Sequence, residues 1–170
     1  MKYLFWNTHH NHNINEILSE LIIENDISIV LLAEYTAEAD ELINLLALKN
    51  VRMQECGSCS ERIKIFGQIK NMEHRKDTDH AIIRIVNNKD ILCCVHLNSK
   101  IYADHENQRE ILIEQIMHDI QEIEKELEIE NTIIVGDFNI NPYDSTCINA
   151  RYFHAIPVYV ETKRKSRKII

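Results

Sequence analysis

The stretch that decides how this chain folds runs Ile133-Ile134-Val135-Gly136-Asp137-Phe138-Asn139-Ile140-Asn141-Pro142. Its three β-branched residues predict a short buried strand, and Gly136 lets the backbone approach a neighbour closely. Asp137 and Asn139 can turn to the same side at the mouth of that strand, where they offer a carboxylate and an amide. A hard divalent cation prefers oxygen ligands of this kind. The competing interpretation is a simple turn, because Asp, Asn, Gly and Pro all form turns.

The composition is that of a globular chain. It has 170 residues, of which 45% are hydrophobic and 27% charged, so we expect one domain over residues 1–160 and a basic tail over 161–170. No apolar run approaches the roughly 18 residues of a membrane span. The segment Met1–Trp6 is too short for the core of a signal peptide. We therefore expect a cytoplasmic protein without a membrane span.

The charge of the chain is uneven. Its formal net charge is −8, which argues against broad nonspecific binding of nucleic acids, because such binding depends on Lys and Arg at phosphates. The last eight residues nevertheless carry five basic ones, Lys163, Arg164, Lys165, Arg167 and Lys168. We expect a solvated tail, and an arm that contacts phosphate is the alternative.

Two clusters of metal-ligating residue types stand out in the sequence. Cys56 and Cys59 form a C-x-x-C without a second pair at zinc spacing, so we expect a loop with incidental thiols, with a redox or metal role as the alternative. His9, His10 and His12 invite a zinc interpretation. No Cys or acidic ligand lies near them in the sequence, and we therefore expect a polar loop.

The first third of the chain predicts a βαβ unit. Tyr3–Trp6 is an apolar strand, Ile14–Ile22 has apolar residues at helical spacing, and Ile27–Ala33 is a continuous apolar run typical of a strand covered on both faces. Such a unit has a right-handed crossover and parallel strands. Asn7 and Glu34, which follow the two strands, should therefore lie close together.

Further elements are expected along the rest of the chain. They are two short strands between residues 51 and 72, a charged loop at 73–79, a hairpin of strands at 81–86 and 91–97, and a long helix at 107–128. Asn13 and Thr36 are the expected N-caps of the first two helices. Ile63 and Ile65 alternate with charged residues, which predicts a strand with one wet face. Ile111 begins the expected apolar stripe of the long helix.

Four apolar runs end in a polar residue. These residues are Asn7, Glu34, His96 and Asp137, the last followed closely by Asn139. Ligand sites in sheets of this kind lie beyond the carboxyl ends of the strands. Each residue alone could simply terminate its strand, but together they offer amide and carboxylate oxygens and one imidazole. That set suits Mg²⁺ or Mn²⁺ and leaves room for water and phosphate oxygens.

Four motifs carry a resemblance to a known family. They are F-W-N at 5–7, L-A-E at 32–34, V-H-L-N at 95–98 and G-D-F-N-x-x-P at 136–142. In their order and approximate spacing they resemble the endonuclease/exonuclease/phosphatase superfamily, which includes pancreatic-type deoxyribonuclease, apurinic-site endonucleases, sphingomyelinases and inositol-phosphate phosphatases. The match covers Leu4 to about Asp144. The last motif is fairly specific, and the first two would be weak alone.

The resemblance implies a fold and a reaction. The fold is a four-layer α/β/β/α sandwich of the deoxyribonuclease-I-like type, and the reaction is metal-dependent hydrolysis of phosphate esters. The first expectation is a Mg²⁺-dependent phosphodiesterase or nuclease. A phosphomonoesterase or lipid phosphodiesterase with the same site, and a non-catalytic module, stay open as alternatives. So does the substrate, among DNA, RNA, nucleotides, inositol phosphates and lipids.

The resemblance also implies roles for single residues. Asn7, Glu34 and Asp137 resemble the metal ligands, and Asp137 also resembles the residue that orients or activates the attacking water. His96 resembles the histidine that serves the phosphate or the leaving group. Asn139 resembles the partner on the phosphate or metal, and together with Asn98 it is a candidate for substrate binding.

The chain departs from the family pattern after its last motif. The family ends with an S-D-H signature, whereas this chain has no Asp after Asp144, and its only later histidine is His154. The region beyond offers one more strand at most, Ile156–Val160. We expect either a fragment whose missing part supplies the Asp-His pair, or a naturally short form. An incomplete second sheet would expose apolar edges, so we expect a homodimer or a partner chain that covers it.

Overall fold

The computed structural model describes residues 1–67, 70, 72–98 and 106–154. The chain forms two compact units, of which the first contains Met1–Leu97 and Ile123–Phe138 and the second contains Asn98–Glu122 and Asn139–Ile170. The expected strand at 156–160 and the basic tail at 161–170 lie outside the described residues. The expectation of one domain over residues 1–160 stays a prediction.

The first sheet contains the predicted βαβ unit. Its strands, in spatial order, are β1 (Tyr3–Asn7), β2 (Ile29–Ala33), β4 (Ile63–Gly67) and β3 (Gln54–Cys56). β1 and β2 are parallel and are joined through α1 (Asn15–Glu24), whereas β4 is antiparallel to both of its neighbours. All five residues of β2 are buried, as the continuous apolar run predicted.

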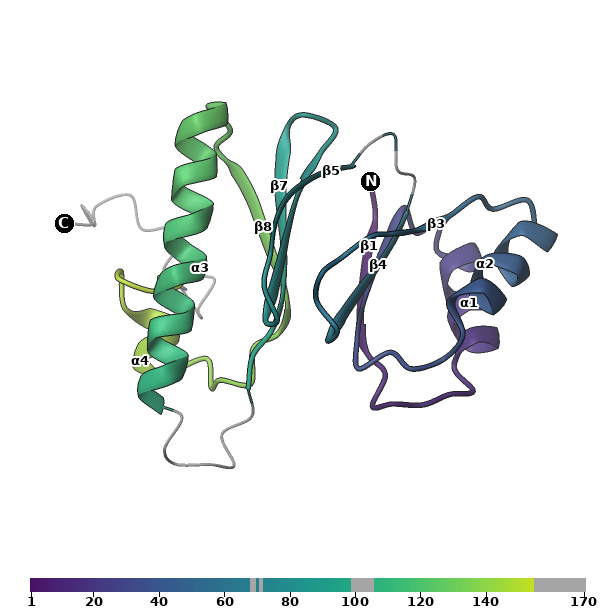
Figure 1. The fold of residues 1–170 in the computed structure, drawn as a ribbon, viewed down its shortest axis with the longest axis horizontal. Helices are drawn as coiled ribbons and strands as arrows, with labels where there is room; N and C mark the ends of the chain where they lie inside the picture. The colour runs from purple at the N-terminus through teal and green to yellow at the C-terminus, as the bar shows by residue number, and fades with distance from the viewer. Residues whose placement is uncertain (68–69, 71, 99–105, 155–170) are drawn as a thin grey trace. The chain divides into compact units, whose positions relative to one another are not determined.

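Two helices cover one face of this sheet. α1 and α2 (Ala39–Leu48) lie together on that face in Figure 1. Leu18 of α1 and Leu42 of α2 are fully buried against Leu32 and Phe66 of the sheet. Each side chain of this size contributes about 1.5–3 kcal/mol when it is fully buried, so this layer fixes the helices firmly on the sheet.

The second sheet is built around the predicted hairpin. Its strands, in spatial order, are β5 (Met72–Asp77), β6 (Ala81–Val86), β7 (Asp90–His96) and β8 (Asn131–Asp137). The turn between β6 and β7 has positive φ at both Asn87 and Asn88, 52° and 55°, which is the conformation of a type I′ turn. β8 then adds to β7 in the parallel direction.

The two sheets of the first unit pack face to face. Leu31 and Ile65 of the first sheet share one buried cluster with Ile82 and Cys94 of the second. On the second sheet, Glu124 in the last turn of α3 (Glu106–Leu127) accepts a hydrogen bond from Thr132 of β8. The fold is therefore α/β, with two stacked sheets and helices. A short helix, α4 (Ser145–Ile148), follows in the second unit.

Both predicted N-caps were wrong. α1 begins at Asn15 after Ile14, and α2 begins at Ala39 after Glu38. The Asn15 side chain is buried in a network at the start of both helices, where it accepts a hydrogen bond from the Tyr35 hydroxyl at 2.6 Å and donates one to Glu41 at 2.6 Å. A tertiary network therefore fixes these helix starts, which local capping rules could not predict.

One prediction about strand environment was also wrong. The charged segment 73–79 is mostly β5, which pairs on one side only, with β6, among the described residues. Charged side chains are common on such an edge strand.

The alternation predicted for β4 is confirmed in part. Ile63 and Ile65 are fully buried in the cluster shared with the second sheet, and the side chain of Lys64 between them is 37% exposed. Phe66 is buried against the helices, so the face that carries Lys64 is not wet along its whole length.

Two apolar positions are more exposed than predicted. Ile111 of α3 is 65% exposed, whereas Ile116, Ile120 and Ile123 farther along the expected stripe are buried, together with Ile113. The expected burial of β8 was wrong: Ile133 is 37% exposed and no residue of the strand is fully buried, and β8 has only β7 as a strand neighbour among the described residues. None of the described helices is both long and apolar enough to cross a membrane.

Candidate functional site

The strand ends that the sequence singled out meet at one edge of the first unit. The parallel register pairs Asn7 with Ala33, the residue before Glu34, and His96 with Asp137. Asn7 lies 27 residues from Glu34 and 130 residues from Asp137 in the chain, yet its side chain contacts both.

One amide joins the two carboxylates. Nδ2 of Asn7 donates hydrogen bonds to Oε1 of Glu34 at 3.2 Å and to Oδ2 of Asp137 at 3.0 Å. Because both hydrogen bonds start from this nitrogen, the distance between the two carboxylate oxygens cannot exceed the sum of the two bond lengths. Nε2 of His96 lies 3.3 Å from the same Oε1 of Glu34. The structure thus brings four of the predicted site residues together.

Unusual backbone conformations hold the two acidic residues in place. Gly136 has a φ of 154°, and a Cβ at this position would lie 1.9 Å from the carbonyl oxygen of Val95. Only glycine therefore allows β8 to lie against β7 and present Asp137 beside His96. Glu34 has a φ of 53°, and its carbonyl oxygen accepts hydrogen bonds from the Thr8 hydroxyl at 2.8 Å and the His10 N–H at 3.1 Å. Strained backbone of this kind is common at functional sites.

His96 is the most enclosed side chain of the cluster, with 9% of its surface exposed. Burial lowers the pKa of His96, and although Glu34 and Asp137 act to raise it, Arg62 and His80 act to lower it further. The imidazole is therefore neutral at neutral pH. Its buried Nδ1 has no hydrogen-bond partner among the described residues. A buried polar atom without a partner is costly and points to a functional position.

Two histidines of the loop after β1 face Glu34. Nδ1 of His9 and Nε2 of His10 lie 3.6 Å and 3.7 Å from Oε2 of Glu34, and both residues have positive φ. No acidic residue lies near these histidines in the sequence. In the structure one does, because the parallel pairing of β1 and β2 brings Glu34 to the loop. Their side chains are largely exposed.

Arg62 and His80 are site residues that the sequence did not single out. Nη1 of Arg62 lies 3.3 Å from Nδ1 of His80, which in turn lies 3.1 Å from the carbonyl oxygen of His96. Each residue directly precedes an apolar strand, β4 or β6, that runs antiparallel to a strand ending at the site. A polar residue just before such a strand is the signal that could have found them.

Asn98 and Asn139 belong to the second unit, so their proposed roles stay predictions. Asn139 has a φ of 49°, a conformation that Asn tolerates better than most residues. His118, Asp119 and Glu122 on α3 are the one set of three His, Cys, Asp or Glu residues, in the part of the chain described, whose ligand atoms all lie within 4.8 Å of one another. Asp119 is buried and accepts a hydrogen bond from Gln115 at 2.8 Å, and His118 lies 3.6 Å from Glu122 one turn along, so contacts within the helix explain this set.

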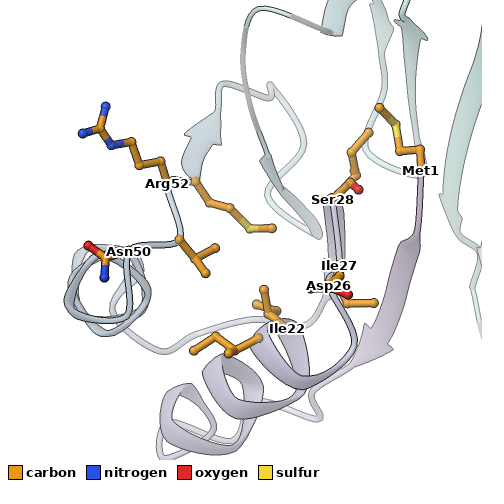
Figure 2. A pocket seen from close by; sticks show the side chains of 11 residues that line it. Met1, Ile22, Asp26, Ile27, Ser28, Asn50 and Arg52 are labelled. Atoms are coloured by element: carbon orange, nitrogen blue, oxygen red, sulfur yellow. The ribbon is translucent and has the colours of Figure 1, made fainter.

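A pocket of about 340 Å³ lies at the opposite end of the first sheet, where β2 begins. Figure 2 shows its lining, which includes Met1, Ile22 and Ile27, with the Arg52 side chain extending outward. It contains none of the predicted site residues, and its lining combines apolar side chains with Asp26, Ser28, Asn50 and Arg52. The predicted site residues of the first unit lie instead at the carboxyl ends of the strands, where sheets of this kind bind their ligands.

The chemistry of the cluster fits a divalent cation. Two carboxylates and an amide supply oxygen ligands, which Mg²⁺ and Mn²⁺ prefer. In the present orientation the amide turns its nitrogen to the carboxylates, while Oδ1 of Asn7 accepts the N–H of His9 at 3.0 Å. A rotation of the amide by half a turn would present Oδ1 beside the two carboxylates.

Comparisons with known proteins address the fold. No family model matches the chain. No curated protein matches it either. Among solved structures, the chain is similar to TDP2 from Caenorhabditis elegans, with 15% identity, a TM-score of 0.54, and coverage of 82% of this chain and 48% of that one. It is also similar to the human Nocturnin catalytic domain with bound sulfate anion, with 15% identity, a TM-score of 0.56, and coverage of 81% and 62%.

A third similar structure is the endonuclease domain of TRAS1, a telomere-specific non-LTR retrotransposon. Its identity is 13% and its TM-score 0.52, with coverage of 82% of this chain and 60% of that one. The chain thus spans about half to two thirds of the length of the solved chains it matches. The chain has a deoxyribonuclease-I-like fold, the fold that its motifs implied.

Proposed function

We propose that this protein is a metal-dependent hydrolase of phosphate esters, with phosphodiesters, including those of nucleic acids, as its first expected substrates. The observation that carries the proposal is the single amide of Asn7 bonded to both Glu34 and Asp137, with His96 against Glu34. Three strands and a loop residue converge to make this cluster, and two carboxylates this close favour a cation between them.

In this proposal Glu34, Asp137 and Asn7 hold a divalent cation, Mg²⁺ or Mn²⁺. When bound, the ion neutralises charge on the phosphoryl oxygens and lowers the pKa of water. The hydrogen bonds through Asn7 already bring both carboxylates to one atom, so a cation that took the place of the amide nitrogen would meet both of them.

The protein's own groups then divide the remaining work. Asp137 orients a water molecule and accepts its proton as the water attacks phosphorus. His96, held neutral by burial, donates one N–H to a phosphoryl or leaving-group oxygen, a role that needs no protonated imidazole at neutral pH. Asn139 and Asn98 are proposed to contact the phosphate, as the family motifs imply.

The structural neighbours support this class of reaction without deciding the substrate. The TRAS1 domain is an endonuclease, and the Nocturnin catalytic domain holds a sulfate anion. A phosphomonoesterase or a lipid phosphodiesterase would use the same cluster. The homodimer or partner chain and the cytoplasmic location stay predictions from the sequence.

The test is hydrolysis by the purified full chain with Mg²⁺ or Mn²⁺. Single-stranded DNA, duplex DNA, RNA, a generic phosphodiester and a phosphomonoester serve as substrates, before and after chelation. We expect Glu34→Gln to lower the rate at least about 100-fold while the melting temperature stays near that of the parent. Glu24→Gln, a matched change at the exposed end of α1, should leave the rate unchanged.

Two results would count against the proposal. Full activity in the Glu34→Gln variant would remove Glu34 from the site. Absence of hydrolysis on every substrate, with both metals, would favour a non-catalytic module that keeps the fold.

A further inference from the structure

Two antiparallel strands begin at the edge where the candidate metal ligands lie. β4 begins with Ile63, which pairs with Ala33, and β6 begins with Ala81, which pairs with Val95. The residues just before these strands, Arg62 and His80, are therefore carried to the ends of β2 and β7. The topology delivers one guanidinium and one imidazole to the site from segments that none of the four motifs includes.

Backbone hydrogen bonds tie both residues to the cluster. The N–H of Glu34 donates to the carbonyl oxygen of Arg62 at 3.2 Å, and the N–H of His96 donates to the carbonyl oxygen of His80 at 2.9 Å. Arg62 and His80 are thus anchored to the same two residues that form the acidic cluster. Their side chains meet each other at 3.3 Å.

An anionic substrate needs a positive group at this place. The chain has a net charge of −8, and Glu34 and Asp137 both repel a phosphate. A guanidinium presents five N–H donors in a planar fork that matches two oxygens of a phosphate group. It also stays charged at every working pH. Arg62 is exposed to solvent, so a substrate can reach it.

We propose that Arg62 binds the phosphoryl group of the substrate and that His80 is the residue that positions Arg62, an inference that rests on the proposed hydrolase function.

The charges at the site then indicate a substrate class. A divalent ion balances Glu34 and Asp137, which leaves the single positive charge of Arg62. A phosphodiester carries one negative charge, whereas a phosphomonoester carries close to two at pH 7. The site therefore favours phosphodiesters.

The contacts of His80 explain how it positions the guanidinium. Nδ1 of His80 faces both the Arg62 guanidinium and the carbonyl oxygen of His96. With its proton on Nε2, this nitrogen accepts a hydrogen bond from Arg62. With the proton on Nδ1, it donates to the carbonyl instead. One nitrogen cannot do both, so the tautomer of His80 decides whether His80 holds the Arg62 guanidinium.

The experiment measures hydrolysis of bis(p-nitrophenyl) phosphate and binding of inorganic phosphate by the full chain. We expect Arg62→Met to raise KM at least about 10-fold with a much smaller change in kcat, and to weaken phosphate binding by a similar factor. Arg62→Lys keeps the positive charge without the planar fork of donors. Its KM and its phosphate affinity should therefore lie between those of the parent and those of Arg62→Met. Arg52→Met removes an exposed arginine at the opposite end of the sheet, and should change neither quantity.

His80 is tested by a double-variant cycle. His80→Ala should weaken phosphate binding less than Arg62→Met does. The double variant should bind phosphate no more weakly than Arg62→Met alone, because His80 acts through Arg62. Additive effects of the two changes would overturn the positioning role.

Failure of this inference is distinguishable from failure of the proposed function. Hydrolysis with an unchanged KM and unchanged phosphate affinity in Arg62→Met would overturn the role of Arg62 and leave the hydrolase function standing. Loss of phosphate binding in Arg62→Met, in a protein that hydrolyses nothing, would support the phosphate site and contradict the hydrolase. If the parent chain binds no phosphate and hydrolyses nothing, both proposals fall. Should Arg62→Met not fold, Arg62→Lys decides by the same two measurements.

Discussion

The two ends of the first sheet differ in how their polar groups are arranged. At the carboxyl ends of β1 and β2, Asn7 and Glu34 are half-buried and bonded to each other across the chain. At the opposite end, Ile27 lines a pocket whose polar residues, such as Asp26 and Arg52, are exposed. Left-handed backbone occurs at both ends, at Glu34 and at Asp26, so it does not separate them. Clustered carboxylates reduce stability and are retained where chemistry needs them, and this contrast supports the proposal that the function lies at the first end.

The largest expected effect would test that contrast directly. Asp137→Asn removes the proposed proton acceptor and one carboxylate ligand. We expect the rate of phosphodiester hydrolysis to fall by about 10²–10⁴, with little change in the unfolding free energy. Asp26→Asn changes an exposed aspartate at the pocket end and should leave the rate as it was. Equal effects of the two changes on the rate would erase the distinction between the ends.

A buried ion pair at the site end makes that end sensitive to acid. Nη1 of Arg84 lies 2.5 Å from Oδ1 of Asp77, and both side chains are 3% exposed. Burial acts to raise the pKa of Asp77, but the hydrogen bonds from Arg84 and from the Cys59 N–H outweigh it, so the pKa is lowered. Because Arg84 also donates to the Gly57 carbonyl oxygen, this pair holds the loop before β4.

Asp77→Asn should lower the free energy of unfolding at pH 7 by about 3–5 kcal/mol, because it leaves a buried guanidinium without its counter-charge. The lowered pKa of Asp77 determines the direction in which the stability of the fold changes with pH. The stabilisation from Asp77 is complete above the unfolded pKa of about 3.9 and is lost as the pH falls through the lower folded value. Urea unfolding between pH 7 and 3 should therefore show a steeper acid loss in the parent than in Asp77→Asn. Parallel curves would contradict this account.

Gly136→Ala should be the next largest change. A Cβ would meet the Val95 carbonyl oxygen at 1.9 Å, and the φ of 154° is strained for any other residue. We expect a loss of about 3 kcal/mol in unfolding free energy, together with loss of activity as Asp137 moves. Gly57→Ala is the control, since nothing lies within 4 Å of its added Cβ. Denaturant titration of both variants compares them, and equal stabilities would show that β8 adjusts freely.

Much of this architecture could be predicted from the sequence. The continuous apolar run before Glu34 and the Asn87-Asn88 turn each have a local cause, and the structure confirms both. The meeting of Asn7 with Glu34 followed from parallel pairing alone. The exposed Ile133 could not be predicted in this way, because apolar content does not say whether a strand lies at the edge of its sheet.

The parts of the site that the sequence missed come from long-range pairing. Arg62 and His80 sit before strands with no motif, and only the antiparallel register of β4 and β6 brings them to Glu34 and His96. The histidines after Asn7 lie in the predicted loop, but the parallel pairing of β1 and β2 places Glu34 beside them, which the sequence did not show. The predictions of helix starts failed similarly, since Asn15 is bonded to groups that lie 20 and 26 residues away in the chain. Motif and capping rules describe residues that are close in the sequence, whereas this site is formed by residues that are close only in space.

The smallest expected effect concerns the support behind Glu34. Tyr35 follows it directly, is buried, and donates its hydroxyl to Oδ1 of Asn15 at 2.6 Å. Burial raises the pKa of Tyr35 to about 12, so the hydroxyl stays neutral and this stabilisation is lost only as the pH rises from about 10 through 12. Tyr35→Phe leaves a buried amide oxygen without this donor and should cost about 1–2 kcal/mol at pH 7.

Tyr143→Phe is the matched control for this change, because Tyr143 is 71% exposed and its hydroxyl can bond to water in either state. Thermal and urea unfolding of the two variants should separate them by the same 1–2 kcal/mol. Hydrolysis should fall only a few-fold in Tyr35→Phe, since the backbone of Glu34 is still held through Thr8 and Arg62. A loss of activity as large as that of Asp137→Asn, without loss of stability, would mean that the network behind Glu34 sets the geometry of the site, and that the two ends of the sheet differ in rigidity as well as in chemistry.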